Sequence, residues 1–246
     1  MAERQLDAVF FDVDDTLFST SKFAARARLA ACEAMHRVGL RLDPQELLDE
    51  LQEVVGEFTS NYDHHFDQLL LRIPKRHYKG VNPGVIVAAA VIAYHDTKAR
   101  ELKPYPDAYD LLRDLAPLEL VRGVITSGLT VKQAEKLLRL GIVPFLTPAA
   151  IYISEQIGIN KPNVKLYRRA CSDLNLKPAN CMYVGDRPER DIDPANALGM
   201  ITVRLVRDGR YAERKGETEA AYTVAHFDEL RAVLRDEFGL PLPAGQ

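Results

Sequence analysis

The sequence predicts an α/β protein with a doubly wound, mostly parallel sheet and an inserted, all-helical domain. Short apolar runs without polar alternation recur along the chain. Such runs are typical of strands that are buried on both faces of a parallel sheet. Helical patterns separate the runs, so strand and helix alternate, as in doubly wound folds. One long interval after the first strand contains helical patterns alone.

The expected strands and core helices follow from these patterns. Strands are expected at residues 8–13, 121–126, 181–184 and 201–205, with a weaker candidate at 149–153. Helices are expected at residues 107–115, 131–140, 164–174 and 188–198.

The interval from residue 17 to residue 100 is expected to form the helical insertion. Its helical patterns cover residues 21–37, 44–59, 63–71 and 82–97. Asp43-Pro44 and Asn82-Pro83 each combine a capping residue with proline, which marks a helix start. The sequence therefore predicts a core domain made of residues 1–16 and 101–246, and an inserted domain of residues 17–100.

Composition excludes several classes of function. The 246 residues carry a net charge of −3, which gives no field that favours nucleic acid or an anionic membrane. The longest uncharged apolar stretch, residues 85–94, is shorter than the roughly 20 residues that span a bilayer. The first residues lack the basic-then-apolar order of a signal peptide, and the three cysteines are widely spaced. We expect a cytoplasmic protein with reduced thiols and no zinc site.

Carboxylates follow the first expected strand. Asp12 stands at its end, and Asp14 and Thr16 lie in the turn that follows. Open α/β sheets bind ligands in a crevice at the carboxyl ends of their strands. We expect this turn to present Asp12 and Asp14 on the same side, around one small volume. Taken alone, the segment also fits a capped turn, in which Asp and Thr are common.

Three further segments end expected strands or open helices. Thr126 and Ser127 precede a glycine turn, which can bind an anion but equally fits a helix N-cap. Lys161 precedes a proline and is restricted to an extended or turn conformation, although a solvated lysine is the usual case. Asp186 lies at the end of the strand at residues 181–184 and Asp191 in the first turn of the helix that follows, so the two can converge on one point. Acidic residues at a helix start are also explained by the helix dipole.

The combination of these segments is more informative than any one of them. Four carboxylates would meet in one crevice: Asp12, Asp14, Asp186 and Asp191. Two unit charges about 4 Å apart repel by about 4 kcal/mol at an effective dielectric constant of 20, so the cluster needs a cation or protonation. Oxygen ligands without His or Cys favour Mg²⁺. With Thr126 and Lys161 as phosphate contacts, the set matches the needs of phosphoryl transfer.

The order and spacing of these residues resemble the haloacid dehalogenase superfamily over the whole chain. The residues that carry the resemblance are Asp12, Asp14 and Thr16, then Thr126, then Lys161, and finally Gly185, Asp186 and Asp191. The helical insertion is similar to the cap of the first subclass, on a Rossmann-like core. Within the superfamily, residues 73–76 and 80–94 resemble an archaeal branch of small phosphatases. Ser127 departs from the pattern, since many relatives carry asparagine there.

The resemblance implies a reaction and a role for each residue. Asp12 would attack phosphorus to form an aspartyl-phosphate, and Asp14 would act as general acid and base. Mg²⁺ would be held by Asp12, the Asp14 backbone carbonyl and Asp186, while Asp191 would act through water or by orienting Asp186. The phosphoryl group would be bound by Thr126, Ser127 and Lys161. The substrate would be a small phosphate ester; the sequence does not indicate an oligomeric state.

Three other functions stay open at this stage. A haloacid dehalogenase would use Asp12 on carbon without a metal, but Asp14 suits an alkoxide leaving group better than a halide. A phosphomutase would share every motif. A non-catalytic binding module would keep the fold without needing the full set of carboxylates and Lys161.

The insertion offers candidate contacts for an anionic substrate. These are the basic residues Lys22, Arg72, Lys75, Arg76 and His77. A solvated basic face explains them equally well.

Overall fold

The computed structural model describes residues 5–207 and 211–244. It divides into two compact units, one spanning Thr20–Leu102 and the other formed by the chain up to Ser19 and from Lys103 onward. Each unit has its own hydrophobic core and is described by itself. No helix in the described ranges is long and apolar enough to cross a membrane.

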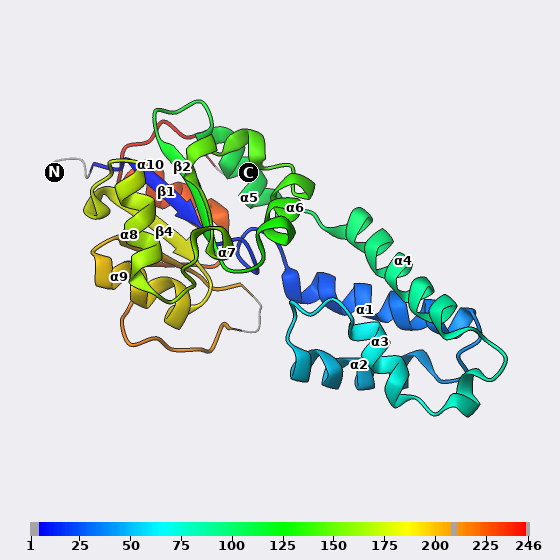
Figure 1. Ribbon diagram of the computed structural model, residues 1–246. Helices are drawn as coiled ribbons and strands as arrows, with labels where there is room; N and C mark the ends of the chain where they lie inside the picture. Colours follow the sequence, from blue (N-terminus) through cyan, green and yellow to red (C-terminus); the bar gives the residue numbers. More distant parts are fainter. Residues whose placement is uncertain (1–4, 208–210, 245–246) are drawn as a thin grey trace. The chain divides into compact units, whose positions relative to one another are not determined.

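The larger unit is built on one sheet in the order β3-β2-β1-β4-β5-β6 (Figure 1). The six strands that the described residues form are β1 (Ala8–Phe11), β2 (Val121–Thr126), β3 (Ile151–Ile153), β4 (Cys181–Gly185), β5 (Ile201–Leu205) and β6 (Tyr222–Val224). Every neighbouring pair is parallel. The expected α/β fold is confirmed, and the sheet is parallel throughout. The short β6, only three residues long, was not predicted.

Helices pack against both faces of the sheet. Successive side chains of β1 point to opposite faces and contact the helices on each side. Phe10 faces the cluster formed with α8 (Val164–Asp173) and α9 (Asp193–Leu198). Phe11 points to the other face, where its ring lies 6.1 Å from that of Phe227, the first residue of α10 (Phe227–Asp236).

Four further helices belong to the described part of this unit. They are α5 (Pro106–Leu115), α6 (Thr130–Arg139), α7 (Ser154–Ile157) and α10 (Phe227–Asp236). A π-helical turn at Pro188–Ile192 precedes α9. The prediction did not include α7 or α10.

The register of the sheet brings the chemistry-bearing segments to one edge. Phe11, the last residue of β1, lies opposite Val124 of β2 and Val184 of β4. Asp12 therefore leaves the sheet between these two strands, and its backbone N–H donates to the Val184 carbonyl at 2.8 Å.

The smaller unit contains α1 (Thr20–Arg37), α2 (Pro44–Phe58), α3 (His65–Arg72) and α4 (Pro83–Glu101). Both predicted caps are present, because Asp43 accepts from the Gln45 N–H and Asn82 from the Gly84 N–H, each at 2.8 Å. The apolar faces of the helices enclose a core of their own. Arg72, one of the basic residues suggested as substrate contacts, forms ion pairs with acidic residues of α2, including Glu50 at 3.1 Å.

All three cysteines are free and buried, as expected for reduced thiols in a protein core. Cys171 of α8 and Cys181 of β4 are neighbours, with their sulfur atoms 4.0 Å apart.

Candidate active site

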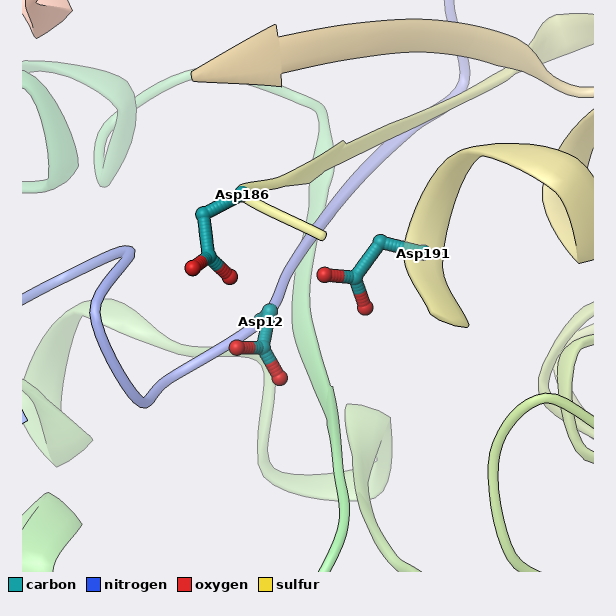
Figure 2. A group of neighbouring side chains, drawn as sticks. All are labelled: Asp12, Asp186 and Asp191. Atoms are coloured by element: carbon teal, nitrogen blue, oxygen red, sulfur yellow. The ribbon is translucent and has the colours of Figure 1, made fainter. Parts of the chain in front are cut away.

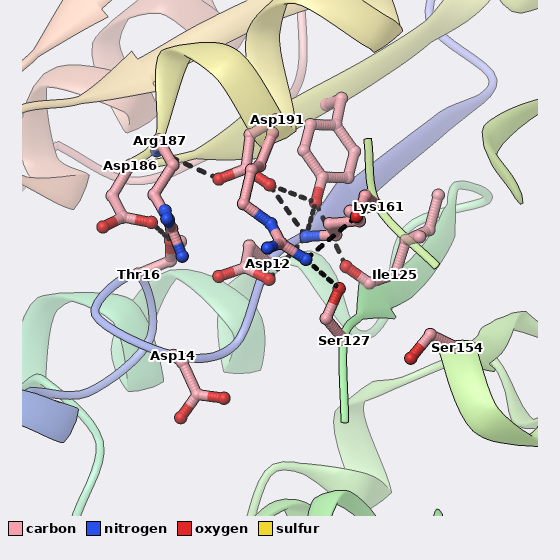
Figure 3. Close-up of polar contacts among 12 residues, drawn as sticks. Asp12, Asp14, Thr16, Ile125, Ser127, Ser154, Lys161, Asp186, Arg187 and Asp191 are labelled. Carbon is pink, nitrogen blue, oxygen red and sulfur yellow. Dashed lines mark hydrogen bonds and ion pairs between the residues drawn. The ribbon is translucent and has the colours of Figure 1, made fainter. Parts of the chain in front are cut away.

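A buried lysine lies at the centre of the predicted site (Figure 3). The Lys161 ammonium donates to Asp12 Oδ1 at 2.6 Å, to Asp191 Oδ1 at 2.8 Å and to the Tyr183 hydroxyl at 2.5 Å. Only 4% of the residue is exposed. Burial alone would lower the pKa of Lys161, but the charges of Asp12 and Asp191 outweigh it and raise that pKa. The alternative that Lys161 is an ordinary solvent-exposed lysine is therefore wrong.

Tyr183 is a member of the site that the sequence analysis missed. It lies in β4, fully buried, and its hydroxyl also donates to the Ile125 carbonyl of β2 at 3.1 Å. Its position inside an apolar strand made it look like an ordinary core residue. Only its hydroxyl could have indicated a role, because a buried tyrosine O–H requires a partner.

Three carboxylates converge at the strand ends (Figure 2). Among the described residues, Asp12, Asp186 and Asp191 each offer an oxygen within 4.8 Å of the others. Burial, together with the charges of Asp191 and Asp14, raises the pKa of Asp12 to about 7, although Lys161 opposes the shift. Burial and the charges of Asp12 and Asp191 raise the pKa of Asp186 to about 9. One lysine thus does not neutralise the cluster.

The donor set fits a hard divalent cation. It consists of carboxylate oxygens, and no thiolate or imidazole belongs to the three-residue cluster. Burial is the main cause of the raised pKa values of Asp12 and Asp186, and the charge of Lys161 does not compensate for it. Asp186 is held only weakly, since the Thr16 hydroxyl donates to its Oδ1 at 3.4 Å. Asp12 and Asp186 are therefore the residues best placed to hold such an ion.

Both carboxylate oxygens of Asp191 accept hydrogen bonds from protein groups. Its Oδ1 accepts from Lys161, and its Oδ2 accepts from the Arg187 backbone N–H at 3.0 Å. A Cβ atom at Gly185 would lie 2.6 Å from the Asp191 carboxyl carbon, so only glycine lets this side chain approach the strand. These hydrogen bonds connect Asp191 to Lys161 and the Arg187 backbone. The action expected of Asp191, through water or by orienting Asp186, stays a prediction.

Asp14 does not join the carboxylate cluster, which corrects the prediction of four converging carboxylates. Figure 3 shows its carboxylate directed away from Asp12. The cause is a pair of side chains on α6: the Lys136 ammonium donates to both oxygens, at 2.6 and 2.8 Å, and the Gln133 amide donates to Oδ2 at 3.0 Å. The sequence analysis did not single out either residue.

Thr126 and Ser127 occupy different environments. The Thr126 hydroxyl is buried and has no hydrogen-bond partner within the described parts of the chain. Ser127 accepts from the Arg190 guanidinium at 3.3 Å, and Arg190 also donates to the Lys161 backbone carbonyl at 2.9 Å. Arg190, which the sequence analysis passed over, thereby connects the loops that carry Ser127 and Lys161.

The fold and this site define a class of protein. Residues 6–199 match the family model described as haloacid dehalogenase-like hydrolase, which is well over half of the chain. The chain belongs to this family of hydrolases, and the resemblance seen in its sequence is confirmed.

Its sequence relatives narrow the class to phosphatases. The chain is 47% identical to the glyceraldehyde 3-phosphate phosphatase of Methanopyrus kandleri, over 93% of this chain and 96% of that protein. It is 36% identical to the protein of the same name from Methanocaldococcus jannaschii, over 94% of this chain and 98% of that protein. Among the enzymes of its family, the chain therefore groups with phosphatases.

Solved structures agree on the fold. A phosphatase of this family from Thermococcus onnurineus superposes with a TM-score of 0.66 at 22% identity, covering 93% of this chain and 98% of that one. A 2-haloacid dehalogenase from Pseudomonas syringae superposes with a TM-score of 0.60, also at 22% identity, over 94% of this chain and 99% of that one. Likeness at this level shows the shared fold and does not distinguish the two chemistries.

Proposed function

We propose that this chain is a Mg²⁺-dependent phosphatase of small phosphorylated metabolites, with glyceraldehyde 3-phosphate as a substrate. The observation that carries the proposal is the buried contact of 2.6 Å between Asp12 and the Lys161 ammonium, inside a cluster of carboxylates. The names of the relatives support the choice of substrate.

Asp12 is the proposed nucleophile. Its carboxylate lies at the end of β1, held by Lys161, and it would attack phosphorus to form an aspartyl-phosphate. Lys161 would bind the transferring phosphoryl group and offset its charge, because its ammonium is already fixed by Asp191 and Tyr183. A fixed donor needs no reorganisation during the reaction.

The other contacts to the phosphoryl group would come from the loop after β2. The buried Thr126 hydroxyl lacks a partner in the part of the chain described, so a phosphate oxygen would satisfy it. Ser127, at the same turn, is held by Arg190 near Lys161.

Asp12, Asp186 and the Asp14 backbone carbonyl would hold the Mg²⁺. When bound, the ion supplies positive charge for the phosphoryl oxygens and for the clustered carboxylates. Asp191 would act indirectly, by positioning the Lys161 ammonium.

Asp14 separates a phosphatase from a haloacid dehalogenase. A halide leaves without a proton, whereas an alkoxide needs a general acid. An acid two residues after the nucleophile, held by Lys136 and Gln133, favours phosphate esters. We also propose that the helical unit of residues 20–102 acts as the cap that selects the substrate.

Replacing the nucleophile tests the proposed function. Asp12→Asn keeps the shape of the side chain but removes its nucleophilic charge, so phosphate release from glyceraldehyde 3-phosphate should fall by at least about 10³-fold, as expected when covalent catalysis is lost. Thermal unfolding of the variant shows whether the fold is intact.

The matched control is Asp173→Asn, an exposed carboxylate of α8 that pairs with Arg169. It should keep full activity. Near-normal turnover by Asp12→Asn would exclude Asp12 as the nucleophile. A phosphomutase would instead leave phosphate on the sugar and release none to solution.

A further inference from the structure

Two side chains of α6 hold the carboxylate of Asp14. Lys136 contacts both of its oxygens, at 2.6 and 2.8 Å, and Gln133 contacts Oδ2 at 3.0 Å. The two residues are three positions apart on the helix and therefore lie on the same face. Lys136 is partly shielded, with 19% of its side chain exposed, and its ammonium lies 5.9 Å from the centre of the Phe18 ring.

Gln133 links this contact to the loop after β2. It is 4% exposed, and its amide group donates to the Ser127 carbonyl at 2.8 Å as well as to Asp14. A Cβ atom at Gly128 would lie 2.7 Å from the Gln133 amide nitrogen. The glycine after Ser127 thus leaves the room in which Gln133 reaches Asp14. The backbone N–H of Gly128 donates to the Ser154 hydroxyl oxygen at 2.9 Å.

The separation of Asp14 from Asp12 matches the geometry of phosphoryl transfer. In an in-line displacement, the attacking and leaving oxygens lie on opposite sides of phosphorus. A general acid must contact the leaving oxygen, so it cannot stand beside the nucleophile. The carboxylate of Asp14 is directed away from Asp12 and is not part of the three-carboxylate cluster (Figure 3).

We propose that Lys136 and Gln133 are positioning residues that hold the Asp14 carboxylate on the leaving-group side of the site. This inference rests on the proposed phosphatase function. Lys136 fixes the carboxylate through both oxygens, and Gln133 fixes it relative to the loop that carries Thr126 and Ser127. Both residues would act through Asp14 rather than on the phosphoryl group.

The proton balance of the reaction involves this pair. As the Asp12–phosphorus bond forms and the bond to the leaving oxygen breaks, the hydrogen-bonded pair of Asp14 and Lys136 gives one proton to the leaving oxygen. When water attacks the aspartyl-phosphate, the pair takes one proton from that water and is restored.

Leaving groups of different basicity test the inference. An alkoxide, as in glyceraldehyde 3-phosphate, needs the acid, whereas p-nitrophenolate leaves without it. In Lys136→Met, kcat/KM for glyceraldehyde 3-phosphate should fall at least about 10-fold, part of the roughly 10²–10⁴-fold that a general acid contributes. The value for p-nitrophenyl phosphate should stay within about 3-fold, because kcat/KM reports the steps up to leaving-group departure. Gln133→Leu should show the same pattern, more weakly.

Two controls separate positioning from a structural effect. Lys136→Arg keeps a cation and should restore most of the lost kcat/KM. Arg139→Met removes a charge from the same helix, where Arg139 pairs with Glu135 at 2.7 Å. This variant should leave kcat/KM unchanged for both substrates. Thermal unfolding of each variant reports whether the fold is retained.

A double variant decides whether Lys136 acts through Asp14. In an Asp14→Asn background, Lys136→Met should cause no further loss. Equal losses for both substrates, or a full loss that persists in this background, would overturn the inference while leaving the phosphatase function intact. If the wild-type protein hydrolyses neither ester with Mg²⁺, the proposed function fails and this inference fails with it.

Discussion

Lys161 shows how a single residue organises this site. It stands 149 positions after Asp12 in the chain, yet its ammonium contacts that carboxylate and Asp191 in a buried setting. Its pairing with proline and the family resemblance pointed to it, but distance, burial and the role of Tyr183 could not be predicted from sequence. A buried tyrosine in a strand reads as core until its partners are known.

Removing the Lys161 charge should destabilise the protein as well as inactivate it. Lys161→Met leaves Asp12 and Asp191 buried without their cation. Breaking a buried ion pair by removing one partner costs about 3–5 kcal/mol, which urea unfolding without metal would measure. Lys165→Met, at an exposed position of α8, is the control and should change stability by no more than about 0.5 kcal/mol. Equal stability of the two variants would show that Lys161 does not stabilise the buried carboxylates of Asp12 and Asp191.

At the scale of elements, the fold was more predictable than the site. The apolar runs and capping pairs located the central strands and the helices of the insertion, because burial on both faces and cap chemistry leave local signals. The edge strand β6 has only three residues, too few for a reliable pattern. The contact of α6 with Asp14 was not predicted either. In the sequence, Gln133 and Lys136 look like ordinary polar helix residues, and only the fold brings Lys136 next to Asp14.

The last residue of β4 gives a test at this scale. Gly185→Ala would place a methyl group 2.6–2.7 Å from the atoms of the Asp191 carboxyl group. The displaced Asp191 would release Lys161, so phosphate release should fall by at least about 10-fold, comparable to other losses of preorganised charge. Gly56→Ala is the control, because a Cβ atom there meets nothing within 4 Å. Full activity of Gly185→Ala would mean that the position of Asp191 does not matter for turnover.

For the whole molecule, the carboxylate cluster makes stability depend on pH and metal. Asp12 and Asp186 have pKa values raised to about 7 and about 9, above the roughly 3.9 of an unfolded Asp. The folded state therefore binds more protons than the unfolded state between these values. Its stability without metal should fall as the pH rises from about 4 to about 9, because the unfolded carboxyls ionise first.

Mg²⁺ should offset this loss. The rise in melting temperature on adding Mg²⁺ should be larger at pH 8 than at pH 5, and at 100 times the Kd the ion should add about 2.7 kcal/mol. Differential scanning calorimetry with and without a chelator measures both effects. Asp186→Asn should weaken both the pH slope and the response to Mg²⁺. A Mg²⁺ response that is independent of pH and of Asp186 would place the ion elsewhere.

The central claim is that Asp12 carries the phosphoryl group during turnover. Asp14→Asn should slow hydrolysis of the aspartyl-phosphate more than its formation from p-nitrophenyl phosphate, because nitrophenolate needs no acid but the attacking water needs a base. Acid quenching, borohydride reduction and peptide mass spectrometry would then locate the trapped group. The account predicts one nitrophenolate released per chain in a rapid burst and reductive modification at Asp12 alone. Modification at another residue, or steady phosphate release with Asp12 replaced by asparagine, would contradict it.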